Sequence, residues 1–132
     1  MRSVIISSVL LAILIAAIGV NAYYVNSVST EMLDMTFSLP SEYNYINSLS
    51  NEEIEICKTE INKLIAKWEK NSLKISLAAK YPDFERVNTS IYSLRDYFFS
   101  EYYGDYIVAR KRLIAALEKQ KHNELPNWEN IF

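Results

Sequence analysis

The feature that most constrains this chain is an apolar run near its amino terminus, Val4 to Val20. No charged residue occurs between Arg2 and Glu31. At about 1.5 Å per residue, a helix from Ser3 to Ala22 reaches about 30 Å, the thickness of a bilayer's hydrocarbon core. A buried helix of a globular protein would be amphipathic, whereas this run is apolar on every side. The run therefore predicts a transmembrane helix.

A cleaved signal peptide is the main alternative, because Val20-Asn21-Ala22 places small residues where a signal peptidase cuts. The apolar run is, however, longer than the core of about 7–15 residues that such peptides have. Tyr23 and Tyr24 also follow at once, where an interfacial aromatic belt would lie. We expect a retained anchor that contacts lipid through residues 4–22, with secretion after cleavage behind Ala22 as the alternative.

The distribution of basic residues predicts the orientation. Arg2 lies on the amino-terminal side of the run, and the first Lys or Arg beyond it is Lys58, outside the short flank that matters. We therefore expect a cytoplasmic amino terminus at a cell membrane. Residues 1–28 form the predicted transmembrane anchor, or an uncleaved signal-like segment, and residues 29–132 the predicted extracytoplasmic helical bundle domain.

Composition limits what the rest of the chain can be. The 132 residues include 14 Lys and Arg against 16 Asp and Glu, and this near balance argues against a nucleic-acid partner. Only two Gly and three Pro favour helices over a turn-rich sheet. A single cysteine, Cys57, excludes an intramolecular disulfide framework. We expect one domain that is stabilised by packing.

Apolar residues at helical spacing predict where the helices lie. The spacing continues from Tyr23 to Leu39, so the anchor helix is expected to run on outside the bilayer until Pro40. The segment Pro40–Leu49 is interpreted as a loop because Ser and Asn stand at turn-forming positions. Ser50 to Glu53 forms a capping box, which begins a predicted helix over 51–80 with Trp68 at the centre of its apolar stripe.

Two further helices are predicted after Pro82. The stripe of the first runs from Phe84 to Tyr102, Gly104 is expected to break it, and Asp105 to cap the next helix, which ends near His122. Amphipathic helices with short connections pack as antiparallel neighbours. The predicted fold class is therefore all-α, with an N-terminal transmembrane helix followed by a small antiparallel helical bundle.

The order of these segments resembles one bacterial family. An amino-terminal anchor, a helix bearing Trp68-Glu69-Lys70, a break at residues 81–84 and a terminal Asn130-Ile131-Phe132 are similar to the family catalogued as domain of unknown function four-three-six-three. The resemblance implies an anchored helical protein that acts beside other membrane proteins of its operon, and it implies no activity. The family often has a His near the break, where this chain has Tyr81, so no role of that His is carried over.

Residues that could carry chemistry are few. Cys57 lies on an apolar stripe, where a small buried hydrophobic role is usual. His122 falls in the last turn of a predicted helix, where a surface histidine is more usual than a catalytic one. One His and one Cys argue against a structural zinc site, and the glycines form no phosphate-binding loop. We therefore expect no catalytic residue, no cofactor and no metal.

The aromatic residues are the most informative feature of the domain. Ten Tyr occur in the chain, and residues 97–106 hold more aromatics than one buried stripe accommodates. Exposed aromatics that gather in one place often mark contact surfaces, although covering a neighbouring helix or the carboxy-terminal tail is the more ordinary role. The candidate interaction surface comprises Tyr97, Phe99, Tyr103, Trp128 and Phe132. The apolar tail 125–132 is expected either to pack on the bundle or to bind a partner.

These observations favour a non-enzymatic, single-pass, membrane-anchored protein. We expect it to act as an interaction or assembly subunit that docks on another membrane protein or on a second copy of itself. The alternative is a secreted or tethered extracytoplasmic domain for ligand binding or sensing, which requires a pocket between helices.

Overall fold

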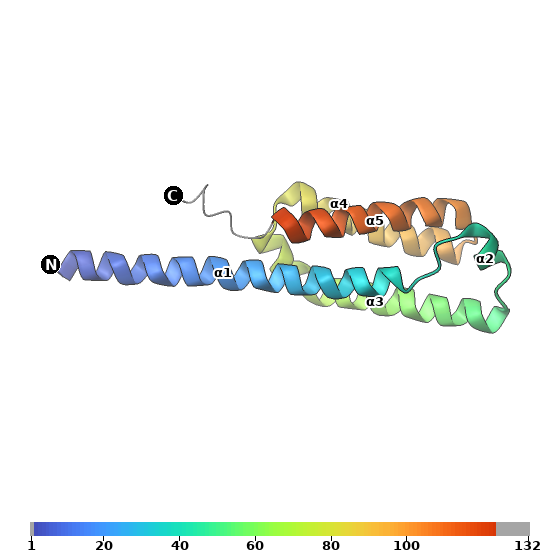
Figure 1. The fold of residues 1–132 in the computed structure, drawn as a ribbon, viewed down its shortest axis with the longest axis horizontal. Helices are drawn as coiled ribbons and strands as arrows, with labels where there is room; N and C mark the ends of the chain where they lie inside the picture. The colour runs from blue at the N-terminus through green and yellow to red at the C-terminus, as the bar shows by residue number, and fades with distance from the viewer. Residues whose placement is uncertain (1, 124–132) are drawn as a thin grey trace.

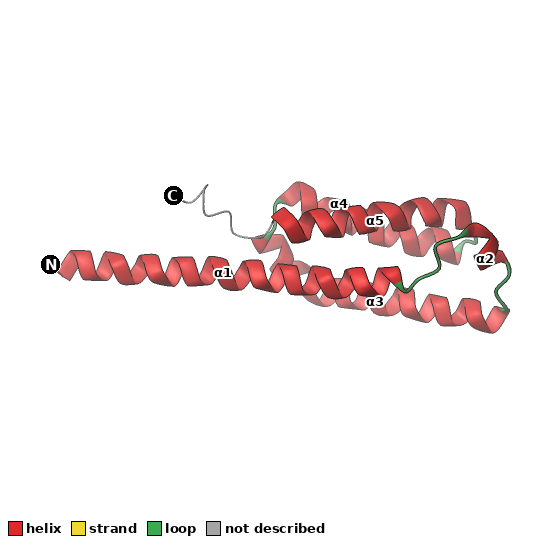
Figure 2. Ribbon diagram, viewed as in Figure 1, coloured by secondary structure: helices red, strands yellow, loops and turns green. Residues whose placement is uncertain are grey.

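The computed structural model describes residues 2–123, and every element in that range is a helix (Figures 1 and 2). The elements are α1 (Arg2–Phe37), α2 (Tyr43–Asn47), α3 (Asn51–Ala78), α4 (Tyr81–Phe99) and α5 (Tyr103–Asn123). The four long helices form a bundle in which α1 and α4 each pack against both α3 and α5. The predicted all-α class is therefore confirmed.

Helix α1 is one unbroken helix of 36 residues with two different halves. Its first half, Arg2 to Asn21, projects beyond the bundle with its apolar side chains exposed, and we call it the stem (Figure 1). Within the described part of the chain, α1 is the one helix long and apolar enough to cross a membrane. Its second half packs into the bundle through Ala22, Val25, Val28, Ser29, Met32, Leu33 and Thr36.

This second half makes α1 the first helix of the bundle as well as the predicted anchor. The expected boundary between residues 28 and 29 falls inside the packed half, and the helix continues through it without interruption. The helix ends at Phe37, shortly before Pro40, as the sequence predicts. The stem is thus joined to the domain by helix rather than by a flexible linker.

The core lies between the four long helices and follows the predicted stripes. Trp68 is fully buried at its centre, and its ring centroid lies 5.1 Å from that of Phe84 on α4. The indole nitrogen of Trp68 donates a hydrogen bond of 2.9 Å to the side-chain oxygen of Asn88. The prediction that Trp68 is a core residue is therefore confirmed.

Polar side chains also join α1 to its neighbours. The amide nitrogen of Gln120 on α5 donates a 3.0 Å hydrogen bond to the hydroxyl of Ser29, and both side chains are fully buried. On the other side of α1, Glu31 forms an ion pair with Lys67 of α3. These contacts fix the rotation of α1 about its own axis, because each one requires a particular face of the helix.

The bundle has a free end and a stem-side end (Figure 1). At the free end, α1 and α4 finish and α2, α3 and α5 begin. At the stem-side end, α3 and α5 finish and α4 begins, beside the point where the stem leaves the bundle.

The connections differ from the sequence prediction in two places. The segment 40–49, interpreted as a loop, contains the short helix α2, whose Ile46 is buried in the core. Helix α3 begins as predicted, because the Ser50 hydroxyl accepts from the Glu53 amide at 3.2 Å and the Ser50 amide donates to the Glu53 carboxylate at 3.3 Å.

The sequence prediction places the break between α4 and α5 too late in the chain. Gly104 and Asp105 lie in the first turn of α5, and Tyr102 stands exposed in the connection instead of continuing the stripe of α4. The reversal occurs at Glu101, whose φ of 65° is left-handed. The Tyr102 amide donates to the carbonyl of Tyr97 at 2.9 Å, which is the helix-ending hydrogen bond of a Schellman motif.

Candidate functional site

The free end is held in shape by two side chains of α5. The Tyr106 hydroxyl donates a 2.8 Å hydrogen bond to the carbonyl of Pro40, and Arg110 donates to the carbonyl of Phe37 at 3.4 Å. Tyr106 is fully buried, and this burial raises the pKa of its phenol well above its usual range, so the group stays a neutral donor. The segment that connects α1 to α2 is therefore fixed on α5.

Large aromatic side chains remain exposed around this end, with exposed fractions from 38% for Phe99 to 62% for Tyr102. We call this set the aromatic cap; it comprises Phe37, Tyr43, Tyr45, Tyr97, Phe99 and Tyr102. Its members come from the end of α1, from α2, from the end of α4 and from the α4–α5 connection. Residues far apart in the sequence thus gather at one end of the bundle (Figure 1).

The structure separates the three predicted surface residues that it describes. Tyr97 and Phe99 are exposed and belong to the aromatic cap. The ammonium of Lys58 on α3 lies 5.5 Å from the centre of the Phe99 ring, at cation–π distance. Tyr103 is half-buried instead, with its ring centroid 5.3 Å from that of the core residue Phe98.

Two predicted surface residues, Trp128 and Phe132, lie outside the described residues, as does the tail 125–132. Sequence reasoning overlooked Phe37, Tyr43, Tyr45 and Tyr102. The alternating tyrosines of Glu42-Tyr43-Asn44-Tyr45 were a usable signal, because two large aromatics in a polar segment are unusual for a plain connection.

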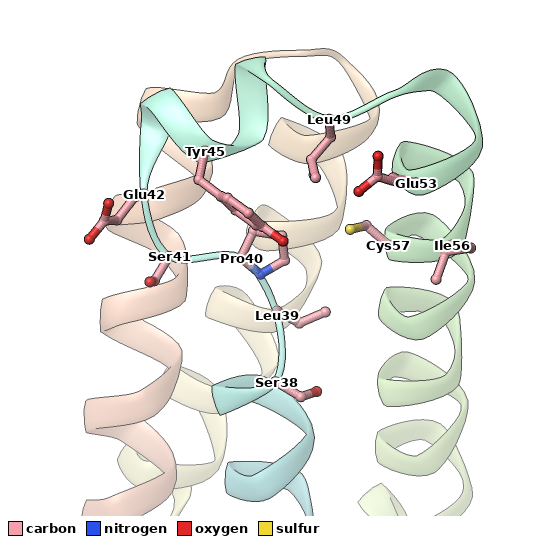
Figure 3. Close-up of a pocket in the computed structure, with 10 residues that line it drawn as sticks. All are labelled: Ser38, Leu39, Pro40, Ser41, Glu42, Tyr45, Leu49, Glu53, Ile56 and Cys57. Atoms are coloured by element: carbon pink, nitrogen blue, oxygen red, sulfur yellow. The ribbon is translucent and has the colours of Figure 1, made fainter.

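A pocket of about 540 Å³ opens at the free end between the 38–42 segment, α2 and the first turns of α3 (Figure 3). Leu39, Tyr45 and Leu49 line one side of it, while Glu53, Ile56 and Cys57 line the other from α3. Most of the wall is therefore apolar, with two carboxylates, those of Glu42 and Glu53, among the lining groups. The Glu53 carboxylate is already engaged with the amide of Ser50 in the helix cap.

The thiol of Cys57, which lines the pocket, is held in its less reactive form. Partial burial, followed by the charges of Glu53 and Glu60, raises the pKa of the Cys57 thiol above its ordinary value, so the nucleophilic thiolate is disfavoured at neutral pH. Within residues 2–123, no group of three or more His, Cys, Asp or Glu side chains is placed to hold a metal ion. The arrangement suits an apolar side chain or small apolar molecule.

Charge adds a second property to the free end. Residues 42–60 carry five Glu and one Lys, and on the α4–α5 side of the same end Glu101 and Asp105 accompany the ion pair of Arg95 with Asp96. A surface that combines exposed aromatic rings with negative charge is complementary to a partner that presents apolar and basic groups.

Comparison with protein-family models, with curated proteins and with solved structures gives no match to this chain. The resemblance to the bacterial family of anchored helical proteins therefore stays a prediction, and the functional argument depends on the chain's own geometry.

Proposed function

We propose that this protein is a non-enzymatic, single-pass membrane protein whose antiparallel four-helix bundle acts as an interaction or assembly subunit outside the cytoplasm. Its partner is another membrane protein or a second copy of the chain, and the free end is the contact surface. The observation that carries the proposal is α1, one helix that is exposed and apolar in its first half and buried in the bundle in its second.

The exposed stem supports the membrane part of the proposal. Val4, Leu10 and Val20 are more than half exposed, and similar apolar side chains surround the whole stem. Burying one such side chain is worth about 1.5–3 kcal/mol, so a stem left in water forgoes a large stabilisation. A bilayer supplies that environment, and Arg2 favours a cytoplasmic amino terminus.

The aromatic cap and the pocket support the interaction part. Both lie at the free end, away from the stem, where a partner that stands in the same membrane can reach them. Aromatic residues dominate the binding energy of protein interfaces, and an apolar pocket beside them can receive one side chain of the partner.

Retention of the stem is tested by fractionating membranes and sequencing the amino terminus of the mature protein. A retained anchor resists alkaline extraction and keeps the original amino terminus, whereas a mature chain that begins at Tyr23 would refute the anchor. Protease treatment of intact cells tests the orientation, and a bundle protected by the cytoplasm would refute it.

The contact surface is tested by co-purification from membranes solubilised in mild detergent, comparing Tyr102→Ser with Tyr81→Ser. Both tyrosines are more than half exposed, but Tyr81 lies at the stem-side end. We expect Tyr102→Ser to weaken recovery of a stoichiometric partner and Tyr81→Ser to leave it unchanged. Equal recovery for both variants would remove the free end as the contact surface.

A second function, ligand binding or sensing, is favoured only by the pocket lined by Leu39, Tyr45 and Cys57. If the pocket binds a small molecule, protein purified from its membrane should carry it, and mass spectrometry of the native protein should detect it. Leu49→Trp, which places a large ring at the pocket wall, should then abolish that added mass.

A further inference from the structure

Large apolar side chains also point away from the core at the stem-side end. Leu73 and Leu77, near the end of α3, are 72% and 82% exposed, and Tyr81, the first residue of α4, is 73% exposed. Leu73 and Leu77 are four residues apart and share one face of α3. Ile75, between them, is fully buried, so this part of α3 is packed on the bundle and is not a frayed end.

Contacts with α1 fix the position of this part of α3 along the bundle axis relative to the stem. The hydroxyl of Tyr24 donates to the side-chain oxygen of Asn71, and the ammonium of Lys74 lies 5.7 Å from the centre of the Tyr24 ring. Leu77 lies three residues beyond Lys74, or about 4.5 Å further along the axis towards the stem. Tyr24 itself follows Ala22, the last residue of the predicted lipid-contacting segment, by two positions.

The charge of α3 changes along its length in the same direction. Residues 51–60, at the free end, carry four Glu and one Lys, whereas residues 64–80, towards the stem, carry four Lys and one Glu. At the same end α5 finishes with Lys121 and His122 in its last turn, while the first turns of α4 carry Asp83, which is buried and paired with Lys119, and Glu85 beside Arg86. Exposed apolar side chains beside lysines are typical of segments that lie in the headgroup region of a bilayer with anionic lipid.

We propose that the corner formed by Leu73, Leu77 and Tyr81 is a second membrane contact, which lies in the headgroup region of the leaflet from which the stem emerges. The inference rests on the proposed membrane anchoring, because a stem outside the bilayer would leave the corner far from lipid. Lys70 and Lys74 of α3 face anionic headgroups while the two leucines and the tyrosine reach the boundary of the hydrocarbon. The stem and the corner together hold the bundle in one orientation on the membrane.

The test uses the full chain with Cys57→Ser, reconstituted into vesicles of phosphatidylcholine and phosphatidylglycerol in equal parts. Single cysteines carrying a nitroxide are introduced by Leu77→Cys, by Ile56→Cys and by Leu10→Cys. Ile56 is the matched control, because it is 62% exposed on the same helix but at the free end. Electron paramagnetic resonance then compares collision of each label with oxygen, which concentrates in lipid, and with a water-soluble nickel complex.

We expect the ratio of oxygen to nickel accessibility to be several-fold higher at residue 77 than at residue 56. Equal ratios at these two positions, with the label at residue 10 deep in lipid, would overturn the second contact and leave the anchor standing. A label at residue 10 that collides freely with nickel would refute the anchor itself. A label at residue 77 shielded from both reagents would mean that protein covers the corner, which also overturns the proposal.

Discussion

Trp68 offers the most direct test of how the bundle is held together. Its side chain is fully buried between α3 and α4, where it stacks near Phe84 and donates to Asn88. Replacing a buried Trp by Ala costs about 3–5 kcal/mol, since the lost transfer free energy is joined by that of the cavity left behind. A domain of this size has a free energy of unfolding of only about 5–15 kcal/mol, so Trp68→Ala should be partly unfolded at moderate temperature.

Two further variants separate the packing from the hydrogen bond. Trp68→Phe keeps most of the ring but loses the donor to Asn88, whose side chain is only partly buried, so we expect a smaller loss of about 1–2 kcal/mol. Ile56→Ala removes a side chain that is 62% exposed on the same helix and should change stability by no more than about 0.5 kcal/mol.

The assay is thermal unfolding of the full chain in detergent micelles, followed by circular dichroism because removing Trp68 alters fluorescence. With a melting-temperature change of about 4–8 °C per kcal/mol for small domains, Trp68→Ala should melt more than about 10 °C below the parent. A variant that melted within about 2 °C of the parent would show that this face of α3 contributes little to packing, and the assignment of the core would be refuted.

Three other predictions concern polar groups. Ser50→Ala removes the acceptor for the Glu53 amide and should lower the free energy of unfolding by about 1 kcal/mol, measured by denaturant titration. Ser29→Ala leaves the buried amide nitrogen of Gln120 without its partner and should cost about 1–3 kcal/mol in the same titration, whereas an unchanged midpoint would mean that water replaces the hydroxyl. Burial raises the pKa of Tyr106 above its ordinary value of 10.0, so the unfolded chain loses this proton first, and stability should decline as the pH rises beyond about 10.

The sequence predicted those parts of the fold that depend on local periodicity. The stripe of α3, its capping box and the burial of Trp68 all follow from residues within a few turns of one another, so they are readable without tertiary information. The end of α4 was not readable in this way. A left-handed backbone is uncommon for Glu, whereas Gly104 is the usual signal for a break, yet the chain reverses at Glu101.

The candidate site was predicted only in part, for a related reason. Tyr97 and Phe99 stood out because they are neighbours in the sequence, and the structure finds both exposed. Phe37 and Tyr45 join them only because α1 and α2 end beside the α4–α5 turn, which is a property of the tertiary arrangement. In the same way, the hydrogen bond from Tyr106 to Pro40 spans 66 residues and leaves no local signal.

The unbroken course of α1 gives the protein a fixed reach. Helix α3, with 28 residues, is about 42 Å long and runs from the free end to the level where the stem leaves the bundle. In a bilayer-anchored chain, the aromatic cap would begin about 22 Å above the membrane at Phe37, fifteen residues beyond Ala22, and reach at most about 40 Å, where α3 begins. The rigid α1 would transmit any tilt of the stem to it. At the tilt of about 20° that is average for transmembrane helices, the cap would move sideways by about 8–14 Å. The headgroup contact of Leu73, Leu77 and Tyr81 would set that tilt, and would thereby decide which neighbours the cap can touch.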